Sequence, residues 1–289
     1  PMGIDGDFPE DQRIADGQSL CFDIETQTEP AEILGHPQLK LEISVNQPLA
    51  LVAARLCDVS PQGDSLLVSW GLFNLCHHRS HENPEPLIPN QKIQVEFPLR
   101  ACAHRLLPGH RWRLSLSTSC FPHAWPSPKL VELQVPPGKN TFLTLPVREK
   151  NDSQTPRFEP AESSIPLDNI ILDQARRNRV VSRDASNGKT VLEDQNHSGR
   201  VLFQESGLEM EDKASDRLEI TKDHPLRMIT ECRRTASIGR GDWQTRIETK
   251  SRMTSDEMNF YLENHLEAYE NDHVVFQKSW KTSVPRSFV

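Results

Sequence analysis

Residue types that could break a bond occur in this 289-residue chain, but their spacing assembles no catalytic set. Hydrolases of the α/β type present a serine nucleophile in a Gly-x-Ser-x-Gly turn, and none of the 13 glycines lies four positions from another. Cys120 lies beside Phe121 in an apolar stretch, where burial raises a thiol pKa and makes the thiol unreactive. His110 follows Gly109 in a turn, yet a general base needs a nucleophile and an orienting acid within reach. We therefore predict no catalytic residue in this chain.

Three histidines, His77, His78 and His81, are the candidates for metal ligands. Zinc in proteins takes a tetrahedral set of Cys, His and carboxylate ligands. No neighbouring carboxylate or thiolate clearly completes such a set, and the six cysteines show no Cys-x-x-Cys spacing. We predict a polar loop here, with no metal ion and no cofactor.

The remaining motifs favour structural roles. Arg240-Gly241-Asp242 matches an integrin-type tripeptide, although a turn explains it equally well. Asn151 and Asn196 begin glycosylation sequons, which have meaning only in a secretory pathway. Tryptophan rings can stack on sugars, but a tryptophan in a strand more often lies in a core or an interface. The five tryptophans are Trp70, Trp112, Trp125, Trp243 and Trp280.

Composition excludes several classes of partner. A formal net charge of -8 argues against a nucleic-acid binder, which needs surplus Lys and Arg to neutralise phosphates. No apolar run approaches the roughly 20 residues of a membrane span, so we expect neither nucleic acid nor a membrane as partner. Most cysteines lie in apolar or alternating segments, which is typical of buried thiols in a reducing compartment, and we predict a cytoplasmic protein. The chain begins at Pro1 without an initiator methionine, and we interpret it as the C-terminal part of a longer enzyme.

Short alternating segments in residues 1–147 predict an all-β fold. Leu39 to Val45 alternates between apolar and polar residues, as a strand with one buried face does. Turns are expected at 61–64 and 107–110, because Pro fixes φ and Gly supplies a positive φ. Many short strands with such turns are typical of a sandwich or a jelly roll. The predicted strands are Leu39–Val45, Leu49–Val59, Leu66–Leu75, Ile93–Leu99, Trp112–Ser117 and Thr141–Leu145.

Charged residues are denser after residue 147, and this half also favours strands. Arg148 to Ser164 lacks apolar periodicity and contains two prolines, which indicates a linker or an exposed crossing strand. Trp243–Met253 and Val274–Trp280 alternate as strands do. Met258–Tyr269 fits both a strand and a helix. The turn-like residues 270–272 that follow it favour a strand in a hairpin.

Several motifs occur in a characteristic order. They are LGHP at 34–37, LCDVSPQG at 56–63, VSWG at 68–71, His78-Arg79, LPGHRWRL at 107–114, STSCFP at 117–122 and NTFLTLP at 140–146. Together they resemble the C-terminal domain of X-Pro dipeptidyl-peptidases and cocaine-esterase-like acyl hydrolases, over roughly residues 10–147. The second half resembles a C-terminal extension of a longer subset of these hydrolases, on KDHPL at 222–226, RGDW at 240–243, Trp280 and VPR at 284–286.

The resemblance implies a galactose-binding-like jelly-roll sandwich. This sandwich would pack against an upstream catalytic α/β-hydrolase domain of the same full-length chain, and that domain would carry the Ser, Asp and His. On this basis we expect residues 1–13 to be the entry segment from that domain and residues 14–147 to form the sandwich. Residues 148–178 should form a linker or crossing segment, and residues 179–289 a C-terminal antiparallel β domain. Met2, Ile4 and Phe8 are then candidates for the rim of the active site. The structural motif residues are Asp58, Gly63, Gly71, Arg79, Gly109, His110 and Arg111.

Three functions follow from these patterns. The first is a non-catalytic region that supports a serine hydrolase and shapes substrate access. The second is a carbohydrate- or ligand-binding module on the same fold, because the fold alone does not determine the function. The third is a scaffold for homo-oligomer contacts through the charged second half.

Overall fold

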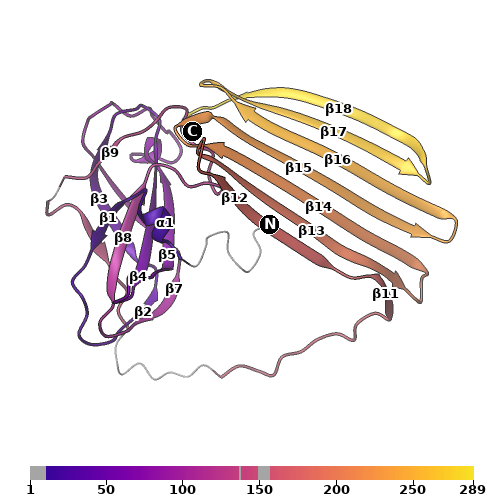
Figure 1. The fold of residues 1–289 in the computed structure, drawn as a ribbon, viewed down its shortest axis with the longest axis horizontal. Helices are drawn as coiled ribbons and strands as arrows, with labels where there is room; N and C mark the ends of the chain where they lie inside the picture. The colour runs from indigo at the N-terminus through magenta and orange to yellow at the C-terminus, as the bar shows by residue number, and fades with distance from the viewer. Residues whose placement is uncertain (1–10, 137, 149–156) are drawn as a thin grey trace. The chain divides into compact units, whose positions relative to one another are not determined.

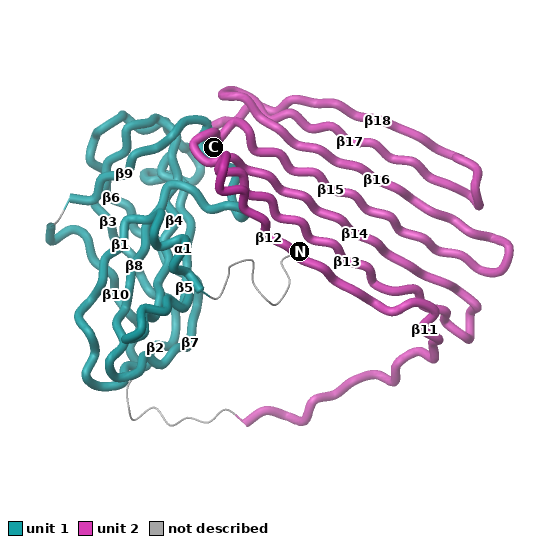
Figure 2. Tube along the Cα trace, in the orientation of Figure 1, with its two compact units in different colours: residues 1–156, 288–289 teal, residues 157–287 magenta. Residues whose placement is uncertain are grey.

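The computed structural model describes residues 11–136, 138–148 and 157–289, and most of them lie in antiparallel strands (Figure 1). The predicted all-β class is therefore confirmed. The chain divides into two compact units, Pro1–Pro156 with Phe288–Val289, and Arg157–Ser287 (Figure 2). No helix among the described residues is long and apolar enough to cross a bilayer.

The first unit is a β-sandwich-like arrangement of short strands. One sheet has the order β1-β8-β4-β5, with bounds Leu20–Asp23, Arg111–Ser117, Leu51–Val59 and Ser65–Asn74. A second has the order β10-β3-β6, with bounds Phe142–Thr144, Gln38–Val45 and Ile93–Pro98, and β9 (Leu133–Gln134) also pairs with β3. Strands β2 (Ala31–Gly35) and β7 (Cys102–Leu106) pair with each other. Two short helices complete the unit, α1 (Arg13–Asp16) and η1 (Leu75–His77).

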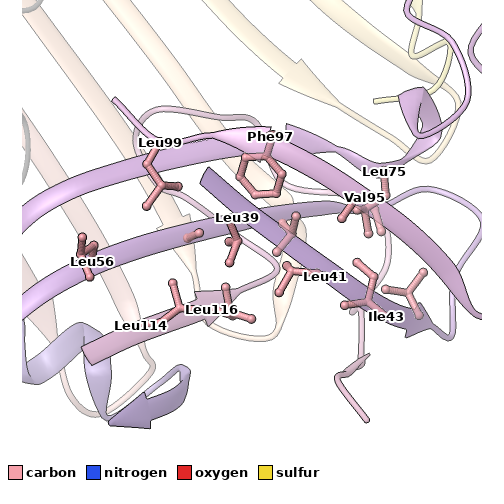
Figure 3. Close-up of a cluster of buried hydrophobic side chains, with 14 of the residues drawn as sticks. Leu39, Leu41, Ile43, Leu56, Leu75, Val95, Phe97, Leu99, Leu114 and Leu116 are labelled. Carbon is pink, nitrogen blue, oxygen red and sulfur yellow. The ribbon is translucent and has the colours of Figure 1, made fainter. Parts of the chain in front are cut away.

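The core of this unit follows from the alternation of its strands. Leu39, Leu41 and Ile43 of β3 are fully buried, as the alternating pattern predicts. They lie in one cluster with side chains of β4, β6 and β8 (Figure 3). Burying each such side chain contributes about 1.5–3 kcal/mol relative to exposure, so this cluster stabilises the unit. All six strands predicted in this half are confirmed, whereas the finer jelly-roll topology stays a prediction.

The second unit is one long antiparallel sheet in the order β11-β13-β14-β15-β16-β17-β18, with β12 also paired to β13 (Figure 1). The bounds are Asn169–Asp173, Arg176–Asp184, Lys189–Phe203, Leu208–Thr221, His224–Arg240, Trp243–Ser255, Asn259–Glu270 and His273–Pro285 for β11 to β18. Strands β16 and β18 contain the two predicted segments, and Met258–Tyr269 is not a helix, because its residues from Asn259 onward form part of strand β17. Strands β11 and the start of β12 lie inside the segment expected to cross between domains.

Tight turns connect the last strands of this sheet. Gly241 and Asn271 have positive φ of 57° and 52°, which two-residue hairpin loops require. Arg240 ends β15 and Gly241-Asp242 is the turn into β16, so the integrin-type tripeptide is a hairpin turn.

The two faces of the second unit differ in chemistry. Residues paired directly across neighbouring strands point to the same face. One such row runs through β13 to β18 with alternating charge, and consists of Glu193, Arg217, Glu231, Arg252, Glu263 and Lys281. A row on the opposite face is apolar and consists of Ala236, Ile247, Ala268 and Phe276. Ile247 and Phe276 are about half exposed, so no second layer within the described part of this unit covers that row.

Candidate functional site

A buried carboxylate in the first unit joins two histidines from different parts of the chain. Asp58 Oδ1 lies 2.7 Å from His110 Nδ1, and Asp58 Oδ2 lies 2.8 Å from His104 Nε2. Asp58 is only 6% exposed. Since β4 carries Asp58 and β7 carries His104, the carboxylate links strands of two different sheets. Sequence reasoning selected Asp58 and His110. It missed His104, because the residues around it in β7 show only a weak alternation of apolar and polar types.

Two glycine turns lie next to each other beside this cluster. Gly63 and Gly109 have φ of 91° and 85°, a region that side chains other than glycine rarely adopt. A Cβ added to Gly109 would lie 3.3 Å from Pro61 Cγ, so the two turns are in contact. The structure therefore brings Asp58, Gly109 and His110 together with the Pro61–Gly63 turn.

The chemistry available to the Asp58 cluster is limited. A carboxylate can orient an imidazole as a base, but a nucleophile must then hydrogen bond to that imidazole. Among the residues that the structure describes, no hydroxyl or thiol hydrogen bonds to His104 or His110. The cluster therefore joins strands of two sheets.

A second buried carboxylate, Asp16, anchors helix α1 to the sheet behind it. Its oxygens accept hydrogen bonds from Ser65 Oγ at 2.7 Å and Ser115 Oγ at 2.8 Å. Arg55 and Arg113 each approach it to 3.2 Å. The Asp16 side chain is 4% exposed, so these four groups replace its water shell. Sequence reasoning missed this cluster, although an arginine among apolar strand residues signals the need for a buried partner.

The backbone a few residues before Asp16 is also hydrogen bonded to β5. Gln12 is fully buried, and its N–H donates to the carbonyl of Ser65 at 2.8 Å. Asp11 forms a β-bridge with Leu66. The polypeptide therefore joins the sandwich at a fixed point on β5.

Asp23 extends the ion pairs along the edge of the same sheet. Arg113 Nε donates to its Oδ1 at 2.6 Å, and Arg111 Nε donates to its Oδ2 at 2.8 Å. The hydrogen bonds from Arg113, and then those from Arg111, lower the pKa of Asp23 to about 2. The predicted motif residue Arg111 thus binds β1 to β8.

The other predicted residues lie apart from these clusters. Gly71 lies in β5, where an added Cβ would be 2.8 Å from Leu99 Cδ2. Arg79 forms an exposed ion pair with Glu85 at 3.2 Å. The predicted rim residues lie outside the described part of the chain; they are Met2, Ile4 and Phe8.

The histidine loop and Cys120 are the remaining candidates that the sequence offered. His77 Nδ1 and His81 Nδ1 lie 3.3 Å apart, whereas His78 Nδ1 donates to the carbonyl of Leu75 at 2.9 Å. Burial raises the pKa of the Cys120 thiol to about 11, which suppresses the nucleophilic thiolate at neutral pH.

Together, the fold and these clusters define a β-sandwich-like domain whose buried ionisable groups bind one another. Residues 5–182 match the family described as the X-Pro dipeptidyl-peptidase C-terminal non-catalytic domain. Because that match covers more than half of the chain, the protein belongs to this family.

Individual relatives are similar over part of this chain. Cocaine esterase from Rhodococcus sp. (strain MB1 Bresler) is 30% identical over 116 residues, which are 39% of this chain and 20% of the esterase. The chain thus spans about a fifth of that relative. A solved α-amino acid ester hydrolase is 28% identical, with 48% of this chain and 27% of that chain covered and a TM-score of 0.46. An aminopeptidase from the marine sediment archaeon Thaumarchaeota archaeon is 21% identical, with 48% and 28% covered and a TM-score of 0.46.

Proposed function

We propose that this chain is the accessory C-terminal region of a serine α/β-hydrolase of the X-Pro dipeptidyl-peptidase and cocaine-esterase type. The membership of residues 5–182 in a non-catalytic domain family carries the proposal. In the parent enzyme, an upstream domain would supply the serine, its base and the oxyanion hole for acyl transfer. The six cysteines are all free, which supports the cytoplasm as its location.

The anchoring of α1 favours a role for the sandwich as a structural support of the catalytic domain. Asp16, Gln12 and Ser65 hold the chain in place where it joins β5. A fixed junction limits the orientations that an upstream domain can adopt. Catalytic groups held in a fixed orientation lose less entropy on reaching the transition state.

Separate production of the two parts tests this proposal. The 289-residue chain alone should not hydrolyse an activated p-nitrophenyl ester or a prolyl dipeptide anilide. Added to the upstream domain, it should bind that domain and raise its turnover. Asp16→Asn should weaken both effects, and the exposed control Glu82→Gln should leave them unchanged. An upstream reading frame without Gly-x-Ser-x-Gly would contradict the proposal, as would turnover by the chain alone that one of its own substitutions abolishes.

We extend the proposal to substrate access through Met2, Ile4 and Phe8. If these side chains line the rim, Phe8→Ala in the full-length enzyme should raise KM and leave kcat nearly unchanged, because it removes binding common to ground and transition states. Leu130→Ala is the matched control, since Leu130 is 55% exposed in the sandwich. Equal effects of the two substitutions on KM would contradict the assignment of Phe8 to the rim of the active site.

The carbohydrate-binding alternative has less support. Trp112 is buried, and the Arg100 guanidinium lies 4.1 Å from the centroid of the Trp70 ring, which leaves less of that ring for a sugar. Calorimetry against simple sugars should therefore show no saturable heat.

A further inference from the structure

Three side chains converge in the second unit although they are far apart in sequence. Asp173 ends β11, His197 lies in β13 and Glu211 lies in β14. One potential donor atom from each lies within 4.8 Å of the others. His197 is only 6% exposed, so the group is centred on a buried imidazole.

Two irregularities in strand pairing create this convergence. The β13 register shifts between His197 and Arg200, and the β11 register shifts between Ile171 and Asp173. Such bulges redirect side chains out of the regular alternation. Gly199 lies within the first of them with a φ of 81°, and an added Cβ would be 2.6 Å from the carbonyl oxygen of Asp173. Only glycine allows the two strands to approach this closely.

The two ring nitrogens of His197 are in different situations. Nε2 lies 2.7 Å from Glu211 Oε1, a hydrogen bond in which the imidazole N–H donates to the carboxylate. Nδ1 then carries the lone pair. This atom is buried without a hydrogen-bond partner, and the nearest carboxylate oxygen, Asp173 Oδ2, lies 3.6 Å away. An unsatisfied buried nitrogen is costly, and 3.6 Å is too long for a hydrogen bond to satisfy it.

The spacing of Nδ1 and Asp173 Oδ2 suits a shared cation. Two atoms that each lie about 2.0–2.2 Å from one zinc ion are about 3–3.6 Å apart. A ligating histidine usually donates its other N–H to a carboxylate, which fixes the ring and makes the ligand more basic. Glu211 stands in that position.

We propose that His197 Nδ1 and Asp173 bind a divalent transition cation such as Zn²⁺, with Glu211 orienting the imidazole and water completing the coordination. The bound ion would fasten edge strand β11 to β13 and β14. Sequence reasoning predicted no metal, because the ligands lie on different strands and form no spaced motif. This inference is independent of the proposed hydrolase role.

Zinc titration of the metal-free 289-residue chain tests the site. Calorimetry should show saturable binding of one Zn²⁺, and the melting temperature should rise with zinc and fall again with EDTA. Asp173→Asn should weaken the affinity by about tenfold or more while the circular dichroism spectrum stays unchanged. Asp173 is partly exposed, so this variant should fold.

The exposed His77–His81 pair provides the matched control. Its Nδ1 atoms, 3.3 Å apart, could bind zinc weakly. His81→Ala should leave the tight binding unchanged. Binding that disappears in His81→Ala and persists in Asp173→Asn would overturn the proposal, as would no saturable binding of zinc to the unmodified chain.

Discussion

At the scale of single residues, buried carboxylates join distant parts of the first unit. Asp58 binds two histidines, and Asp16 binds two arginines and two serines. Each carboxylate is stable in the interior only because several donors replace water around it. Removing one carboxylate therefore leaves donors unsatisfied as well as losing its own bonds.

Asp58→Asn should destabilise the first unit. The amide cannot accept from His104 and His110 with both of its terminal atoms, so one partly buried imidazole loses its partner. We expect a loss of about 2–4 kcal/mol in the free energy of unfolding, measured by urea denaturation. Glu82→Gln, an exposed substitution, should cost far less. A loss for Asp58→Asn no larger than for Glu82→Gln would refute the structural role.

Asp23→Asn should change the acid dependence of stability. The folded-state pKa of Asp23 is about 2, below the ordinary value of 3.8. The carboxylate therefore stabilises the fold above pH 4, and this contribution disappears as the pH falls through 2. The Asp23 side chain is 34% exposed, so we expect only about 1 kcal/mol at pH 6. The difference in unfolding free energy between the two proteins should shrink toward pH 2; a constant difference would contradict the ion-pair assignment.

At the scale of elements, strand β5 approaches β6 and its following residues closely at Gly71. An added Cβ would lie 2.8 Å from Leu99 Cδ2 and 3.2 Å from the carbonyl oxygen of Pro98. Leu99 is fully buried and has little room to move. The requirement for glycine at this position thus comes from packing, not from its backbone angles.

Gly71→Ala should destabilise the first unit by about 1–3 kcal/mol, because the methyl group overpacks a filled core. Gly138→Ala is the control, since a Cβ there would meet nothing within 4 Å. Urea denaturation of both variants measures the effect. Equal stabilities would show that Leu99 relaxes freely.

The alternating charge row is a feature of the second unit's strand register. Arg252 lies between Glu231 and Glu263 on the neighbouring strands. Like charges directly opposite each other destabilise a sheet, so the register and the charge pattern support each other.

Arg252→Glu should lower the melting temperature by a few degrees, because it places three carboxylates in a row. The double variant with Glu231→Arg should recover part of this loss. Differential scanning calorimetry at low and high salt measures both, and the loss should decrease with salt. An effect independent of salt would indicate lost packing and not lost charge pairing.

At the scale of the whole molecule, the two units differ in how they bury their side chains. The first has a cluster of fully buried aliphatic residues, whereas Val191, Leu192 and Met228 are the buried apolar residues among those described in the second. The second half of the chain also has more charged residues, and these need contact with water. The formal net charge of the chain is -8.

This net charge predicts no general affinity for nucleic acid. Phosphate binding depends on release of counterions by clustered Lys and Arg, and an acidic protein lacks that driving force. Fluorescence anisotropy with a labelled DNA duplex at low salt should show no binding. Saturable binding with a steep salt dependence would refute the prediction.

The sequence by itself determined the all-β class, most strands of the sandwich, the absence of a nucleophile elbow and the family resemblance. These properties depend on short-range patterns, because alternation and turn residues act over a few positions. The tertiary structure alone decided that Asp58 joins His104 and His110, that Asp16 anchors α1, and that Asp173, His197 and Glu211 meet. Such contacts depend on strand register and bulges, which bring together residues that no local pattern connects.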